Sequence, residues 1–190
     1  MSRLPNLSLD TMSDEQKQVH ATITSGPRGS VRGPLAVWLQ CPELASRAQA
    51  LGEYCRYNTS LPPRLSELAI ITTAAQWQAN YEWHAHAKFA NQEGLSDAII
   101  EAIRVGDAPS FDAEDERIVH RLATELYATR EVSDETWAAA QQILGPQRVM
   151  DLIGILGYYA LISMTVKSYR IPLPDGVSPY FPNASGSIND

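Results

Sequence analysis

Apolar residues recur three and four positions apart along much of the chain, the spacing that places side chains on one face of an α-helix. Such stripes are expected in residues 42–58 at Leu44, Ala48, Leu51 and Tyr54 or Cys55, and in residues 113–130 at Ile118, Leu122 and Leu126. No stretch alternates between apolar and polar positions over several residues, as a half-buried strand would. We therefore expect an all-α fold with about eight helices.

Capping residues, prolines and glycines mark the expected helix boundaries. Ser13 followed by Gln16 forms a capping box for a helix that ends near Thr24. Further helices are expected to start at Pro42, Pro63, Asn80, Ser96, Asp112 with Asp115, Ser133 and Pro146. Residues 25–34 read as a loop, and this loop carries Arg28 and Arg32.

Two of these helices are too apolar for a solvated surface. Leu68–Ala75 carries no charge, and the helix that starts at Pro146 must be buried within the chain or between subunits. Its longest uncharged run, residues 152–166, is shorter than the roughly 20 residues that a membrane span needs. The N-terminus has no apolar leader, so we expect a soluble, cytoplasmic protein.

A chain of 190 residues with 44% hydrophobic content fits one globular domain. Along it we distinguish an N-terminal helix and loop (1–35), a helical domain (36–171) and a tail rich in proline and glycine (172–190), expected to be extended and, if ordered, to lie on a neighbour. The net charge of −7, with 15 scattered Lys and Arg, disfavours nucleic-acid binding. Cys41 and Cys55 form no close pair, so neither a disulfide framework nor a thiolate zinc site is indicated.

Titratable groups concentrate between Leu65 and Gly94. At the helical period Glu67 shares a face with Ile70, Ile71 and Ala74, so its carboxylate points into the core and needs a partner or a proton. Arg64 or a backbone amide can supply that partner in a purely structural role. In the next helix Glu82 and His86 are four residues apart on one face. A turn between the helices would bring Glu67, Glu82 and His86 together.

The segment ELAIITTAAQWQANYEWHAHAKFA (67–90), preceded by LPPRLS, resembles the carboxymuconolactone decarboxylase family and its relative, the alkyl hydroperoxidase D group. Supporting segments are GPLAVWLQCPELA (33–45) and YYALISMTVKSYRIPLPDG (158–176). The resemblance implies an alkyl hydroperoxidase D-like helical bundle that forms trimers or hexamers. In the redox branch of the family a glutamate is followed by a Cys-x-x-Cys pair and a histidine. Those places read Glu67, Ala79, Glu82 and His86 here, so the thiol nucleophile is missing.

The resemblance implies a lyase without a cofactor, acting on a small organic acid or lactone such as those of aromatic degradation. His86 would stabilise or protonate the anion left by decarboxylation, and Glu67 would set the tautomer of His86 and exchange the proton. Glu82 would be a second acid, whose closeness to Glu67 raises at least one of the two pKa values.

An arginine should anchor the substrate carboxylate: Arg64, or Arg28 and Arg32 from the loop. Tyr81, Trp83 and His84 are further candidates for substrate binding. No metal is expected, because side chains two residues apart on a helix, such as His84 and His86, diverge by roughly 200°. Two alternatives stay open: a peroxidase that uses Cys41 or Cys55, and a non-catalytic protein that binds a small ligand.

Overall fold

The computed structural model describes residues 3–4 and 7–182, which contain nine α-helices, one π-helical turn and no strand. The fold is all-α, as the sequence predicts. The elements are α1 (Asp14–Ser25), α2 (Pro34–Trp38), α3 (Pro42–Glu53), the π turn η1 (Tyr54–Asn58), α4 (Pro63–Gln76), α5 (Asn80–Gln92), α6 (Asp97–Val105), α7 (Glu114–Thr129), α8 (Asp134–Leu144) and α9 (Pro146–Ser168).

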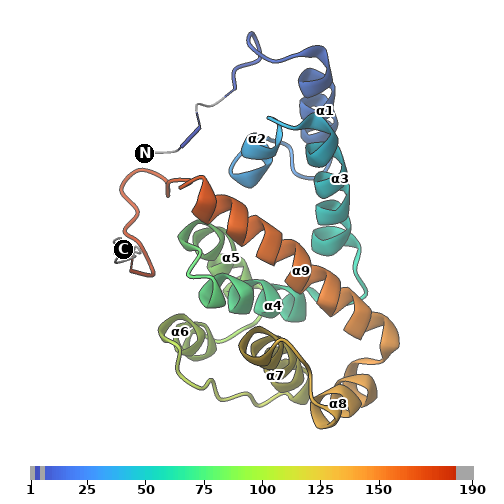
Figure 1. Cartoon of the computed structure of the whole chain (residues 1–190). Coiled ribbons are helices and arrows are strands. Elements are labelled where there is room, and N and C mark those ends of the chain that lie inside the picture. Colours follow the sequence, from blue (N-terminus) through green and yellow to red (C-terminus); the bar gives the residue numbers. More distant parts are fainter. Residues whose placement is uncertain (1–2, 5–6, 183–190) are drawn as a thin grey trace, which may run out of the picture.

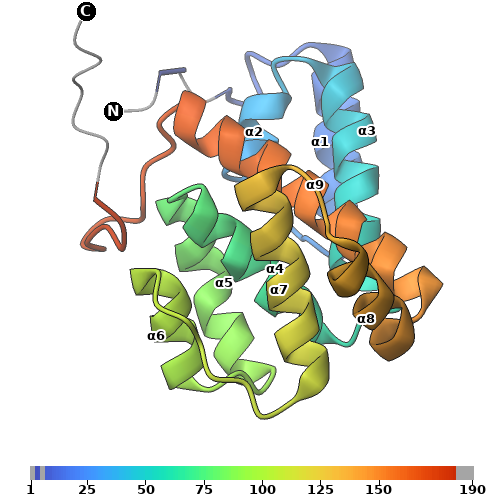
Figure 2. The same cartoon turned by 60° about the horizontal axis from the view of Figure 1, so that its bottom comes forward.

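Helix α9 crosses the middle of the molecule, with α1–α3 on one side and α4–α7 on the other (Figures 1 and 2). By length and composition it is apolar enough to cross a membrane, and 61% of its most apolar 18-residue stretch is buried within the chain. This burial agrees with the prediction that the last helix avoids a solvated surface. Because α4 packs on α5, α7 and α9, it lies at the centre of the second group.

The predicted helix caps are confirmed at Ser13, Ser96 and Ser133, whose side chains accept hydrogen bonds from backbone amides in the first turn. Two predicted caps are wrong. Helix α7 starts after Ala113 and not at Asp112. Asn80 is the first residue of α5 rather than its cap, because its side chain binds the C-terminal segment instead.

The inward face of α3 differs from the predicted stripe. Leu44, Leu51 and Tyr54 are 44%, 48% and 43% exposed, whereas Ala48 and Cys55 are buried. The reason lies at Gly52, where a Cβ atom would be 2.0 Å from the Tyr158 hydroxyl of α9. Small residues therefore face inward because the Tyr158 side chain reaches from α9 to this face of α3, and the larger apolar side chains point outward.

The end of the tail packs on α5 of its own chain. Asn80 Oδ1 accepts hydrogen bonds from the amides of Tyr180 (2.7 Å) and Phe181 (2.8 Å). The Phe181 ring also packs edge-on against Trp83, with ring centroids 5.3 Å apart. The remainder of the predicted tail, residues 183–190, lies outside the described residues.

Candidate active site

Glu67 is the only ionisable residue between Leu65 and Ala74, a stretch of α4 that is buried throughout. Its side chain is directed to α5 because α4 and α5 pack together around the short turn at residues 77–79. There the Nδ1 atom of His86 lies 2.7 Å from Glu67 Oε2. A buried carboxylate thus has the partner that its position requires.

His86 is 2% exposed and is held on both ring nitrogens. Its Nε2 atom lies 3.1 Å from Nη1 of Arg56. Because a guanidinium only donates hydrogen bonds, Nε2 accepts this one, and a neutral ring then carries its proton on Nδ1 and donates it to Glu67. The edge-on ring of Tyr159, with its centroid 5.1 Å away, closes another side of the imidazole.

Glu82 lies one helical turn before His86 on α5 and is 4% exposed. Its Oε2 atom is 3.6 Å from His86 Nε2. Burial raises the pKa of Glu82, while His86, Arg56 and Arg28 oppose the rise and Glu67 adds a smaller increase. The direction agrees with the sequence-based expectation, but desolvation contributes more than the neighbouring carboxylate.

Arg56 is not among the residues that the sequence predicts, because η1 reads there as the ordinary end of a helix. The guanidinium carbon lies 5.6 Å from the centroid of the Tyr57 ring and 5.4 Å from that of Phe89. Burial opposes its charge, but Tyr159, Tyr57 and Glu67 outweigh this effect and raise the pKa of Arg56. The only sequence signal is an arginine next to the inward-facing Cys55.

The model of the carboxymuconolactone decarboxylase family matches residues 42–124. This range contains Arg56, Glu67, Glu82 and His86. Over this segment the chain is similar to the carboxymuconolactone decarboxylase family.

Solved structures show the same helical fold at low sequence identity. A peroxidase-related protein from Ralstonia eutropha JMP134, described as an alkylhydroperoxidase AhpD core, superimposes with a TM-score of 0.74 and 16% identity, covering 92% of this chain and 93% of its own. One from Silicibacter sp. TM1040 gives a TM-score of 0.70 at 16% identity, covering 90% and 91%. A variant of the debrominase Bmp8 in complex with 2,3,4-tribromopyrrole gives 0.72 at 12% identity, covering 92% and 95%. No curated protein matches the chain significantly.

Three residues that the sequence predicts to bind substrate have other partners. Arg64 donates to Asp115 at 2.9 Å and to Glu116, so it does not satisfy Glu67. His84 Nδ1 lies 2.9 Å from the Tyr180 hydroxyl, and Trp83 is 2% exposed beneath Phe181. Each of these three side chains therefore contacts other residues of its own chain.

Tyr81 lines two cavities, of about 440 Å³ and about 830 Å³. Arg32 and His20 also line the smaller one, among apolar side chains. Burial and the Glu82 carboxylate raise the pKa of Tyr81, and Arg32 counteracts them.

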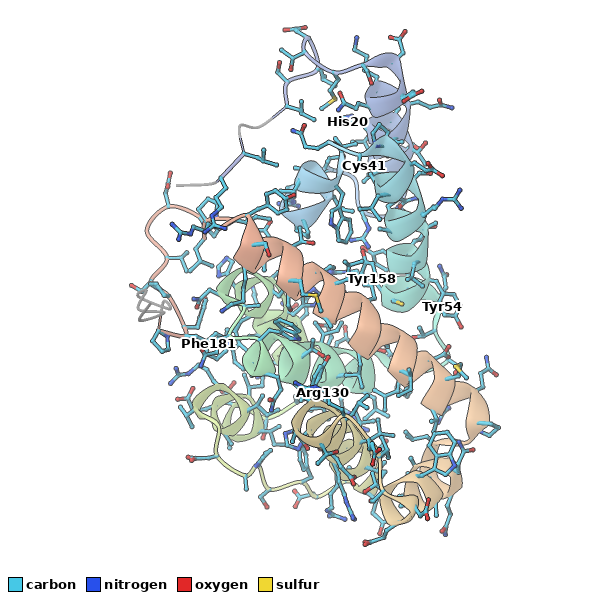
Figure 3. The ribbon with its side chains drawn as sticks, in the orientation of Figure 1. His20, Cys41, Tyr54, Arg130, Tyr158 and Phe181 are labelled. Atoms are coloured by element: carbon cyan, nitrogen blue, oxygen red, sulfur yellow. The ribbon has the colours of Figure 1, made fainter. Side chains whose placement is uncertain are left out.

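The two cysteines lie on α3 and η1, apart from the positions of the family's thiol pair. Cys41 is exposed where α3 begins, and Figure 3 shows it well away from Tyr158. Cys55 is fully buried, and burial raises its pKa to about 11, with a smaller contribution from Asp151. Among the described residues, no group of three or more His, Cys, Asp or Glu side chains is arranged to hold a metal ion.

Proposed function

We propose that the protein is a cofactor-free carboxy-lyase that releases carbon dioxide from a small organic acid or a lactone acid. The observation that carries the proposal is the line of hydrogen bonds from Arg56 through the buried His86 to Glu67, with the Glu82 carboxyl group beside it. Proton donors and acceptors are present together, which is what decarboxylation followed by protonation needs.

In the proposed first step the bond between the carboxyl carbon and its neighbour breaks, carbon dioxide leaves, and the electron pair stays on the substrate as an enolate. Glu82 then gives its proton to the enolate carbon and becomes a carboxylate. The raised pKa of Glu82 suits this role, because burial favours the protonated acid. His86 takes up a proton from solvent on Nε2 and passes it to Glu82, which restores the acid, and Glu67 balances the charge of His86 while it is protonated.

A thiol peroxidase is the competing enzyme class. It needs a thiolate, and the pKa of about 11 keeps Cys55 protonated near neutral pH. Cys41 is exposed but lies at the other end of α3 from Gly52, where α3 meets Tyr158. These observations favour the lyase.

The test is release of carbon dioxide from a panel of small unsaturated acids and lactone acids, with peroxide consumption measured in parallel. The Cys41→Ser/Cys55→Ser double variant is expected to keep carbon dioxide release at the wild-type rate. Peroxide consumption that disappears in this variant, with no carbon dioxide from any acid, would instead establish the peroxidase. Thermal stabilisation by the acids without any product would establish a ligand-binding protein.

Self-association into trimers or hexamers is part of the proposal. The outward-facing Leu44, Leu51 and Tyr54 of α3 and η1, together with Met150, which is 70% exposed on α9, offer apolar surface for a second copy. Light scattering after size exclusion measures the assembly, and a monomer at micromolar concentration would contradict it.

A further inference from the structure

Two arginines reach the buried cluster without a carboxylate partner. Arg56 comes from η1, and Arg28 comes from the loop between α1 and α2. Among the described residues, neither forms an ion pair, whereas Arg47, Arg64, Arg104 and Arg121 all do. The Nε atom of Arg28 is also buried without a hydrogen-bond partner. A buried donor of this kind is costly unless a ligand or water satisfies it.

Consecutive tyrosines on α9 hold these arginines in place. The Tyr158 hydroxyl lies 3.5 Å from Arg28 Nη2, and the neighbouring Tyr159 attracts Arg56. The two phenol rings are nearly perpendicular, at 89°, with centroids 5.4 Å apart. Burial raises the pKa of Tyr158 to about 12 and that of Tyr159 well above its usual value, so both phenols stay neutral and supply no negative charge to the arginines.

Gly52 makes room for this arrangement. A Cβ atom there would lie 2.0 Å from the Tyr158 hydroxyl and 2.6 Å from Arg28 Nη2. Gly52 and Arg56 are four residues apart on the continuous helix of α3 and η1, and residues so spaced share a face. Arg28, packed against Gly52, therefore lies about one turn from Arg56.

The charges of the cluster favour a bound anion. Glu67 is occupied by His86, and the Glu82 carboxyl group is pushed by burial toward its neutral form. Two guanidinium groups then face one carboxylate. The rings of Tyr57 and Phe89 beside Arg56 are 45% and 43% exposed, so the Arg56 end of the cluster lies near the surface.

We propose that Arg28 and Arg56 together bind the carboxylate of the substrate acid, and that Arg56 leaves His86 Nε2 when it does so. This inference rests on the proposed function, because it takes the bound acid to be the substrate of the lyase. Binding of a carboxylate by the two arginines does not depend on it. Binding would then free Nε2 beside the acid, and His86 would become available for proton transfer when substrate is present. Of the three arginines suggested by the sequence, the structure favours Arg28, and it adds Arg56.

Calorimetric titration with sodium benzoate and sodium sorbate tests the anion site without requiring turnover. Arg28→Gln and Arg56→Gln are each expected to raise Kd at least about tenfold, because each removes charge-assisted hydrogen bonds. Arg56→Lys should recover part of the affinity, since it keeps the charge but loses the planar fork. Arg148→Gln, at an exposed position on α9, is the charge-matched control and should bind like wild type.

The ring ¹⁵N signals of His86 test the second half of the proposal. Benzoate should shift Nε2 in the wild type, and unliganded Arg56→Gln should already show an altered Nε2 environment. A merely structural arginine would give no shift on adding benzoate. If Arg56→Gln does not fold, the Nε2 signal of His86 is measured in Arg56→Lys instead.

Several results would overturn the proposal. They are no binding of either acid at millimolar concentration, equal affinity in Arg28→Gln and wild type, or a loss of binding in Arg32→Gln alone, which would place the site in the neighbouring cavity. Inorganic phosphate binding in place of the carboxylates would also overturn it. If the acids bind as expected but no acid of the panel loses carbon dioxide, the anion site stands and the lyase proposal fails.

Discussion

The Nδ1 atom of His86 lies 2.7 Å from the Oε2 atom of Glu67, joining α5 to α4 inside the protein. The Glu67 carboxylate accepts this hydrogen bond, so Glu67 fixes Nδ1 as the ring nitrogen of neutral His86 that carries the proton.

Glu67→Gln should therefore keep the fold but lower turnover of a confirmed substrate by about 10²–10⁴-fold, the usual contribution of a positioned acid or base. His86→Ala should do the same. Circular dichroism checks the fold, and steady-state kinetics measure the rate. The exposed Glu131→Gln is the control and should turn over like wild type. Wild-type rates in both site variants would show that the pair is structural.

Glu82 should make the protein less stable as pH rises. Its pKa in the folded state is raised from 4.5, so the folded protein holds a proton that the unfolded chain releases. The free energy of unfolding of the wild type then falls between these two pKa values, by about 1.4 kcal/mol for each unit of separation. Urea titrations at pH 5, 6, 7 and 8 should show Glu82→Gln gaining stability relative to wild type as pH increases. A difference that does not change with pH would contradict the raised pKa.

Asp151 on α9 anchors the chain that follows η1. Its carboxylate accepts hydrogen bonds from the Tyr54 hydroxyl (2.6 Å), the Ser60 amide (2.7 Å) and the Ser60 hydroxyl (2.6 Å). Asp151→Asn replaces an acceptor by a donor and should lower the free energy of unfolding by about 1–3 kcal/mol at pH 7.

This effect should fade in acid. Burial alone would raise the pKa of Asp151, but the bonds from Ser60 and Tyr54 outweigh it and lower the pKa below 3.8. The stabilisation is thus complete above pH 3.8 and is lost as pH falls through the folded-state pKa. Denaturation at a series of pH values from 7 down to 2 follows this decline, with the exposed Asp175→Asn as control. A loss that stays the same over the whole series would contradict the mechanism.

The two thiols should differ sharply in reactivity. Cys41 is exposed, whereas Cys55 is fully buried with a pKa of about 11. N-ethylmaleimide at pH 7.5 should give one adduct on the native protein, at Cys41, and two after denaturation. Peptide mass spectrometry locates the adducts. Rapid native labelling of Cys55 would mean that η1 opens readily.

Asn80 should hold the end of the tail. Asn80→Ala removes the acceptor of the Tyr180 and Phe181 amides, so hydrogen exchange of residues 172–182 should increase while that of α9 stays unchanged. Asn91→Ala is the matched control, because Asn91 on the same helix bonds to Leu95 and Asp97 instead. Unchanged exchange in the tail would show that Phe181 packing alone retains it.

Much of the helical fold is accessible from local sequence signals. Serine caps and prolines mark most helix starts, and the apolar run after Glu67 places that carboxylate in the core. The encounter of Glu67 with His86 follows from helix periodicity and one short turn, which are local properties.

The parts that sequence reasoning misses depend on contacts between distant segments. The inward face of α3 is chosen by Gly52 meeting Tyr158, more than 100 residues later in the chain. Arg56 reaches His86 from a π turn, which no hydrophobic spacing predicts. Asn80 binds Phe181 across a separation of 101 residues instead of capping its own helix. In each case tertiary packing overrides the local preference.

The resemblance to the redox branch of the carboxymuconolactone decarboxylase family implies that Ala79 and Glu82 take the places of its two cysteines. No sulfur belongs to the line of groups from Arg56 through His86 to Glu67. Its state is therefore governed by protons and not by electron transfer, and a change from reducing to oxidising surroundings would leave it intact.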